Sequence, residues 1–204
     1  MSRKLPPRQE GNLRRALAQE AARVMAEHGI RDFLFAKRKA AERFGVVDGA
    51  VLPRNTEIED ALAEYQRLFG GDDHVESLLA QRLAAVEAMR WLQDFQPRLV
   101  GPVLHGTATP HSDVQLHVFA DRAESVAFRL MDRGVPYEVA EKRLKLNADR
   151  VLAQPSLQFE IDAQAIEVVV FPVDGIRQAP ASPVDGKPMR RADLTEVETL
   201  IETG

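Results

Sequence analysis

The sequence predicts an α+β protein in which a helical region, residues 1–96, precedes a small mixed β-sheet domain, residues 97–204. Two observations support this prediction. Apolar residues recur at helical spacing through the first half, whereas beyond Pro97 they alternate along short segments rich in β-branched residues. Two of these later segments are joined by a tight turn at 162–164, which favours a mixed sheet over a doubly wound parallel one.

The first half contains four predicted helices, over 16–29, 31–45, 56–69 and 74–95. Three of them should end at glycine, because Gly29, Gly45 and the Gly70–Gly71 pair each follow the last residue of an apolar stripe. Asn55 or Thr56 is the expected cap of the third helix, since both side chains accept hydrogen bonds from backbone N–H groups.

The fourth predicted helix, residues 74–95, is the longest. Leu79, Leu83 and Val86 recur near the helical period, so we expect them to face the core. The lone tryptophan, Trp91, is interpreted as a packing residue.

The second half contains the segments expected to form the sheet. Strand-like segments span 98–106, 113–121, 135–146, 156–162 and 165–171, and a helix is predicted over 123–134. Residues 175–189 form a proline-rich irregular extension, and Asp193 is the expected cap of a short final helix. Along 113–121 the residues alternate in direction, with Val114, Leu116 and Val118 on one face and Asp113, Gln115, His117 and Phe119 on the other.

The composition predicts a soluble, cytoplasmic protein. Hydrophobic residues make up 45% of the chain, which is enough to bury a core of ordinary size. There is no cysteine, so disulfides and thiolate metal sites are excluded. No apolar run approaches the roughly 20 residues that a membrane-spanning helix needs, and the amino end lacks the apolar segment of a secretory signal.

Charge is distributed unevenly along the chain. Residues 1–43 hold 11 Lys and Arg against 5 Asp and Glu, or +6, whereas the remainder holds 16 against 26, or −10. This basic amino end suggests an anionic partner such as RNA, or a protein partner, although a solvated helix surface explains the same charges. The cationic surface expected on the second helix comes from Lys37, Arg38, Lys39 and Arg43.

The stretch GPVLHGTATPHSDVQLHV, from Gly101 to Val118, carries the chemistry. Glycine lets the backbone approach a phosphate closely, and its N–H groups can hold the phosphate oxygens. A carboxylate on the following strand can hold a divalent cation against the same phosphate. Two carboxylates two residues apart would hold two cations for an in-line phosphoryl displacement, but here Asp113 is followed by Gln115.

This stretch resembles the signature of the nucleotidyltransferase superfamily, which includes DNA polymerase beta and the minimal nucleotidyltransferases. The resemblance covers about 97–172 and implies a nucleotidyltransferase-like domain that binds a nucleoside triphosphate with Mg²⁺ or Mn²⁺. It implies that phosphate contacts come from Gly101, Gly106, Thr107 and Ser112. It also implies that Asp113 and Glu167 are catalytic and that Asp113, Gln115 and Glu167 hold the metal, with Glu160 as second choice for the later acid.

Two residues depart from the family's pattern. Pro102 replaces the serine of Gly-Ser, which removes one backbone N–H and one hydroxyl from the phosphate site. Gln115 replaces the second acid and brings no charge, so magnesium should bind more weakly. With His117 on the same face, the site could instead suit a softer cation such as manganese or zinc, or the face could be a packed polar surface.

Further polar residues lie near the motif in the sequence. His105 and His111 flank the turn and could contact a phosphate, although the sequence favours a surface position for each. Arg143 and Lys145 alternate along a predicted strand and could neutralise a triphosphate, or they could form a solvated face.

Three functions are therefore open. The protein could be an enzyme that transfers a nucleotide to a protein, RNA or small-molecule hydroxyl, with weak or absent activity. It could be an inactive module of the same fold that binds RNA, a nucleotide or a protein. It could also be an antitoxin-like or scaffold protein whose helical half forms the interface.

Overall fold

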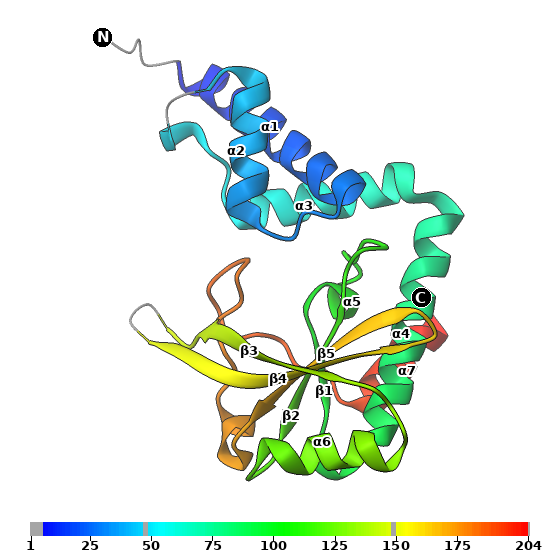
Figure 1. Ribbon diagram of the computed structural model, residues 1–204. Coiled ribbons are helices and arrows are strands. Elements are labelled where there is room, and N and C mark those ends of the chain that lie inside the picture. The colour runs from blue at the N-terminus through cyan, green and yellow to red at the C-terminus, as the bar shows by residue number, and fades with distance from the viewer. Residues whose placement is uncertain (1–5, 47–48, 148–149, 204) are drawn as a thin grey trace. The chain divides into compact units, whose positions relative to one another are not determined.

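A computed structural model describes residues 6–46, 49–147 and 150–203 of the chain (Figure 1). The chain divides into two compact units, Met1–His74 and Val75–Gly204. The first unit is helical and the second contains the sheet, so the protein is α+β, as predicted. The division falls earlier than residue 96, because the buried side of helix α4 (Gly71–Trp91) belongs to the core of the sheet unit.

The first unit is built around its longest helix, α1, which packs against both other helices. Its elements are α1 (Pro7–His28), α2 (Phe33–Phe44) and α3 (Asn55–Tyr65), with the turns η1 (Gly49–Val51) and η2 (Gln66–Gly70). Gly29 and Gly45 end α1 and α2, as predicted, and each has φ +65°. The buried residues of the unit, including Leu17, Ala36 and Ile58, form a core of their own.

The start of α3 differs from the prediction. The N-cap is Arg54, so Asn55 and Thr56 lie inside the first turn. The Glu57 carboxylate accepts a hydrogen bond from the Arg54 N–H at 2.7 Å. An acid in the first turn thus satisfies a terminal backbone donor, in place of a capping side chain at Asn55 or Thr56.

The second unit contains a mixed sheet, which within the described residues has five strands in the order β1–β2–β5–β4–β3. The strands are β1 (Arg98–Val100), β2 (Val114–Phe119), β3 (Glu138–Lys145), β4 (Val151–Ile161) and β5 (Gln164–Phe171). β2 and β5 are parallel, and the other neighbouring pairs are antiparallel. The tight turn between β4 and β5 is confirmed, with Asp162 and Ala163 at φ +48° and +62°.

One face of the sheet is covered by helices (Figure 1). These helices are α4, α6 (Ala123–Asp132) and α7 (Leu194–Thr203). The prediction that Leu79 and Leu83 face the core was wrong, because they are 41% and 52% exposed. The buried side of α4 consists largely of alanines, which a search for large apolar residues does not find. Its buried residues are Gln81, Ala84, Ala85, Val86, Ala88 and Met89.

The opposite face of the sheet is covered in part by the proline-rich extension. The turn η4 (Val173–Arg177) follows β5, and its Ile176 packs against a small cluster formed by Phe119, Val169 and Phe171. The final helix begins at Leu194 with the predicted cap, because the Glu196 N–H donates to Asp193 Oδ1 at 3.0 Å.

Membrane-spanning length and apolarity are not combined in any helix of the described residues. α1 is 22 residues long, but charged side chains such as Arg14, Glu20 and Arg23 recur along it. α4 is 21 residues long and likewise carries charged residues throughout.

Candidate functional site

The glycine turn after β1 is the start of a short helix, α5 (Gly101–His105). The strand predicted over 98–106 was therefore wrong beyond Val100. Pro102 fits the first turn of a helix, because the N–H that proline lacks would have no intrahelical partner there. Gly106 follows the helix with φ +77° and turns the chain into the loop. The motif's turn is thus a helical turn with glycine at both ends.

Gly101 lies against the side chain of Gln115. The glycine has φ +74°, and a Cβ built on it would lie 2.8 Å from Gln115 Oε1. The conformation therefore favours glycine at this position, and the Gln115 side chain would have to shift to admit a Cβ. The first glycine of the motif and the residue in the second metal position are brought together.

The loop between α5 and β2 is held by its own hydrogen bonds. The Thr109 N–H donates to Ser112 Oγ at 2.9 Å, and the Ser112 N–H donates to the Thr109 carbonyl at 2.9 Å. Thr107 is buried, and its N–H donates to the Pro102 carbonyl at 3.0 Å. Thr107 and Ser112, both expected to bind phosphate, therefore use polar groups within the loop.

Gln81 of α4 also holds this loop, and sequence reasoning missed it. The side chain is 1% exposed, and its Nε2 donates to the carbonyls of Thr109 at 2.9 Å and Ser112 at 3.2 Å. No sequence signal pointed to this contact, because an isolated glutamine in a long helix is usually a solvated residue. The predicted apolar stripe instead placed Leu79 and Leu83 toward the core.

The parallel pairing of β2 with β5 brings two of the predicted metal residues together. Gln115 and Glu167 are register partners, so their side chains leave the same face of the sheet. Asp113 comes two residues before Gln115, where the loop enters β2. Glu160 lies on β4, which β5 separates from β2. The sheet order therefore places Glu167 closer to the motif than Glu160.

The Glu167 carboxylate is buried and is paired with an ammonium group. Glu167 is 5% exposed, and its Oε2 lies 2.7 Å from Lys142 Nζ. Ser156 Oγ makes a longer contact with Glu167 Oε1, at 3.4 Å. Lys142 belongs to β3, so its side chain crosses β4 to reach Glu167. A residue of this chain therefore neutralises the charge that a metal ion would neutralise.

Taken together, the three predicted metal residues fit a divalent cation poorly. Gln115 offers a neutral amide oxygen, and the Glu167 carboxylate already shares its charge with Lys142. In the described part of the chain, no group of three or more His, Cys, Asp and Glu residues is arranged to hold a metal ion.

His117, the proposed donor to a softer cation, is engaged elsewhere. It is 2% exposed, and its Nδ1 accepts a hydrogen bond from Arg191 Nε at 3.2 Å. Burial, together with the charges of Arg191 and Lys142, lowers the pKa of His117 to about 3, so the ring is neutral at pH 7. The Arg191 guanidinium also lies 5.0 and 5.2 Å from the ring centroids of Phe119 and Phe171. The histidine anchors the C-terminal segment to the sheet.

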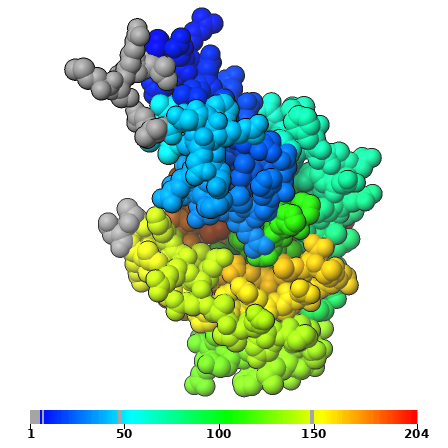
Figure 2. Space-filling view, turned by 45° about the horizontal axis from the view of Figure 1, so that its top comes forward, coloured from blue at the N-terminus to red at the C-terminus, as the bar shows by residue number. Residues whose placement is uncertain are grey.

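Other candidate residues lie away from Glu167. Arg143 and Lys145 are exposed on β3 and, because side chains alternate along a strand, point to the face opposite Glu167. The exposed outer surface of this strand is visible in yellow-green in Figure 2. His105 and His111, which flank the α5 turn, are both exposed.

Several cations of the basic amino end are paired within the helical unit. Arg43 Nη1 lies 2.8 Å from Glu20 Oε1, and Lys39 Nζ lies 3.1 Å from Glu42 Oε2. Lys37 is half-buried, and burial lowers its pKa. The basic surface predicted from the sequence is therefore partly neutralised by neighbouring carboxylates.

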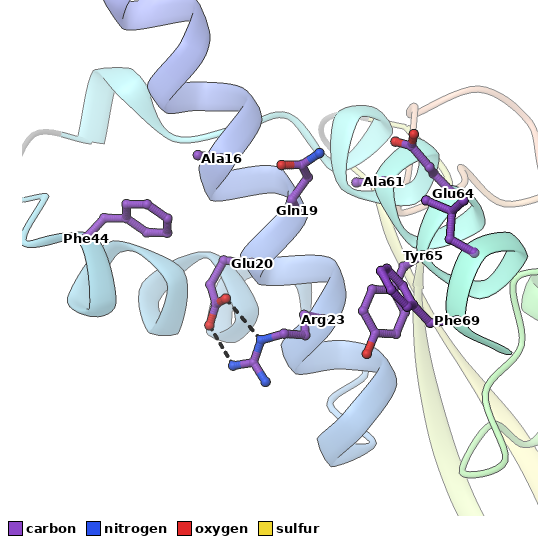
Figure 3. A pocket seen from close by; sticks show the side chains of 10 residues that line it. Ala16, Gln19, Glu20, Arg23, Phe44, Ala61, Glu64, Tyr65 and Phe69 are labelled. Carbon is purple, nitrogen blue, oxygen red and sulfur yellow. Dashed lines mark hydrogen bonds and ion pairs between the residues drawn. The ribbon is translucent and has the colours of Figure 1, made fainter.

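The helical unit also contains a pocket of about 500 Å³ (Figure 3). The rings of Tyr65 and Phe69, with centroids 5.0 Å apart, lie along one side of it. Glu20 and Arg23 face each other across a 2.8 Å ion pair, and hydrogen bonds from Arg23 keep the pKa of Glu20 below its ordinary value. Two charged groups of the pocket, Glu20 and Arg23, are therefore paired with each other, while Glu64 adds a further carboxylate to the lining. Its lining residues are Ala16, Gln19, Glu20, Arg23, Phe44, Ala61, Glu64, Tyr65, Leu68 and Phe69.

Comparison of the chain with protein-family models, with curated proteins and with solved structures gave no match. The resemblance to nucleotidyltransferases therefore rests on the residues of the motif. The geometry adds the neighbouring positions of Gly101, Gln115 and Glu167.

Proposed function

We propose that the sheet unit is a nucleotidyltransferase-like module that binds a nucleoside triphosphate beside α5, with weak or absent transfer of the nucleotide to an acceptor. One observation carries the proposal. Gly101, Gln115 and Glu167 are far apart in the sequence, yet Gly101 lies against Gln115 and Gln115 pairs with Glu167. These are the residues that the motif assigns to one site, and Asp113 adjoins them.

The polar groups of this region suit binding better than chemistry. Lys142 is about one-third exposed, so its ammonium can approach an anionic ligand while it contacts Glu167. In the family's reaction a bound divalent metal would neutralise phosphate charge, but here the second carboxylate is an amide. The proposed weakness of transfer follows from this missing charge.

The proposal is tested by titrating the protein with each of the four labelled nucleoside triphosphates, in Mg²⁺, in Mn²⁺ and in EDTA. We expect binding of at least one nucleotide, and we expect Gly101→Ala to weaken it about tenfold, because the added Cβ would displace the Gln115 side chain at the proposed site. Gly134→Ala is the matched control, because Gly134 also has a positive φ (+68°) but a Cβ there would meet nothing within 4 Å. No binding under any condition, or equal losses in the two variants, would reject the proposed site.

The alternative functions have less structural support. RNA binding at the basic amino end would need free cations, and Lys39 and Arg43 are paired with carboxylates. A protein partner could use the apolar wall of the pocket in the helical unit, for which no particular partner is indicated. If RNA is the ligand, its affinity should fall steeply with salt and weaken in Arg38→Ala, whose side chain is exposed on α2. Salt-independent binding would exclude this alternative.

A further inference from the structure

We infer that the Lys142 ammonium takes the place of a divalent cation at Glu167, so that this pocket holds phosphate without a metal ion. The claim that the ligand is a phosphate rests on the proposed function, whereas the claim that Lys142 replaces a cation does not. The inference comes from four residues on or beside one face of the sheet. Three of them, Gln115, Lys142 and Glu167, lie on that face, and the fourth, Asp113, directly precedes β2.

The first argument is the local charge. An amide at Gln115 has one negative charge fewer than the carboxylate of the motif, and Lys142 adds one positive charge. Both differences reduce the attraction of the site for a cation. The two charge differences also lie close together, because Gln115 and Glu167 are register partners and Glu167 is paired with Lys142. The amide at Gln115 and the ammonium of Lys142 therefore act together. The first weakens metal binding, and the second supplies the positive charge that the metal would have supplied.

The second argument is the position of the ammonium. Glu167 is 5% exposed, and a carboxylate at that depth requires a charged or hydrogen-bonding partner. Lys142 is this partner, because its Nζ lies 2.7 Å from Glu167 Oε2. It reaches Glu167 from β3, a strand that is not adjacent to β5. Arg143 and Lys145 lie on the other face of β3 and cannot serve. The pairing is therefore specific to this lysine.

The third argument is that Lys142 can contact a ligand as well as Glu167. Its side chain is 37% exposed, whereas the side chain of Glu167 is 7% exposed. An ammonium group has three N–H donors, and the contact with Glu167 Oε2 uses one of them. The remaining donors suit phosphate oxygens, which lysine binds as a point charge.

The decisive experiment measures Mn²⁺ binding without nucleotide, by the electron paramagnetic resonance signal of free Mn²⁺. The double variant Gln115→Asp with Lys142→Met restores the acid and removes the ammonium. We expect it to bind Mn²⁺ about tenfold more tightly than the wild type and than either single variant. The matched control is Gln115→Asp with Lys145→Met, which removes a lysine from the opposite face of the same strand.

Equal Mn²⁺ affinity in the double variant and its control would overturn the inference, because the Lys142 charge would then be irrelevant to metal binding. Circular dichroism checks that each variant is folded. If Lys142→Met unfolds the protein, Lys142→Gln replaces it, since glutamine is neutral but keeps a donor for Glu167. The same tenfold difference is expected with glutamine.

A second measurement tests the ligand half of the inference. Nucleotide affinity of the wild type should agree within about threefold in Mg²⁺ and in EDTA, and Lys142→Met should lower it about tenfold in EDTA. Nucleotide binding that requires Mg²⁺ would overturn the inference even if the proposed function holds. Absence of all nucleotide binding would reject the proposed function, while the Mn²⁺ experiment would still decide whether Lys142 replaces a cation.

Discussion

The two faces of the sheet are made by alternate residues of the same strands, yet they differ in kind. On the helix-covered face, Val114 and Leu116 of β2 lie beside Ile166 and Val168 of β5, and each is at most 1% exposed. On the opposite face, Gln115 pairs in register with Glu167 between these apolar positions. One face is therefore an aliphatic core, and the other contains buried polar groups that need specific partners.

The difference shows how the two faces are determined. An aliphatic face needs only apolar side chains at every second position, because dispersion and burial are not directional. A polar face needs each buried group to find a partner, and those partners come from other parts of the chain. For Glu167 the partner is Lys142, and for His117 it is Arg191.

Leu116→Ala should produce the largest effect, because it leaves a cavity in the aliphatic face. The residue is 0% exposed, so we expect a loss of about 3 kcal/mol in the free energy of unfolding. Urea denaturation measures it. Val139→Ala is the control, because Val139 is 71% exposed and the change should cost less than about 0.5 kcal/mol. Similar losses in the two variants would contradict the description of this face as the core.

The polar face should make stability depend on pH through His117. Its pKa is lowered from 6.5 to about 3 in the folded protein, chiefly by burial, so the unfolded chain binds this proton first as pH falls. The stability that depends on a neutral His117 is therefore fully present above about pH 6.5 and is lost as pH falls toward 3. The expected slope from this residue is roughly 1.4 kcal/mol per pH unit.

His117→Gln isolates that slope from the contribution of carboxylates. We expect its unfolding free energy to fall less steeply than that of the wild type between pH 6 and 4, as measured by urea denaturation at each pH. A change in absolute stability is also expected, because Arg191 loses its acceptor. Parallel curves for the two proteins would mean that His117 is not the group that titrates on unfolding.

The aliphatic face could be predicted from the sequence, and the polar face could not. Alternation in DVQLHVF and the β-branched run of AIEVVVF identified the inward residues directly, since a strand's period is fixed by its geometry. The glycine stops after α1 and α2 were equally local signals. The motif also identified Asp113, Gln115 and Glu167 as neighbours, and the structure brings Gln115 and Glu167 together.

The partners of the polar residues depend on contacts distant in sequence. Lys142 and Glu167 are 25 positions apart, and Gln81 and Thr109 are 28 apart, so no local period connects them. From the sequence, Arg143 and Lys145 could be cations of the site or a solvated face. The pairing register decides which face of β3 points to Glu167, and it selects Lys142. A shift of one residue reverses that choice.

The ion pair of the polar face should contribute less to stability than the aliphatic core. Lys142→Met leaves the Glu167 carboxylate buried without its ammonium, and we expect a loss of about 1 to 3 kcal/mol in unfolding free energy, reduced by the partial exposure of the lysine. Lys145→Met is the control, since it removes an exposed lysine three residues away, on the opposite face of β3. Urea denaturation at low and high salt measures both. Equal stability of the two variants would show that solvent already satisfies Glu167.

Gln81→Met should have the smallest effect on global stability and a local effect at the entrance to β2. Methionine fills a similar volume but removes the Nε2 donor of the Thr109 and Ser112 carbonyls. The Thr109 carbonyl keeps the Ser112 N–H as its donor, so the change should cost about 1 kcal/mol. Hydrogen exchange should accelerate at the Ser112 amide, which donates within the loop. Glu87→Met, an exposed change on the same helix, is the control.

Because this loop joins α5 to β2, nucleotide affinity should also fall in Gln81→Met if the loop lines the proposed nucleotide site. Unchanged exchange at Ser112 would mean that the loop's own hydrogen bonds suffice to hold it. Faster exchange with unchanged nucleotide affinity would show that Gln81 stabilises the loop without contributing to the nucleotide site. Faster exchange together with weaker nucleotide binding would show that α4, the helix that covers the aliphatic face, also orders the loop beside the polar face.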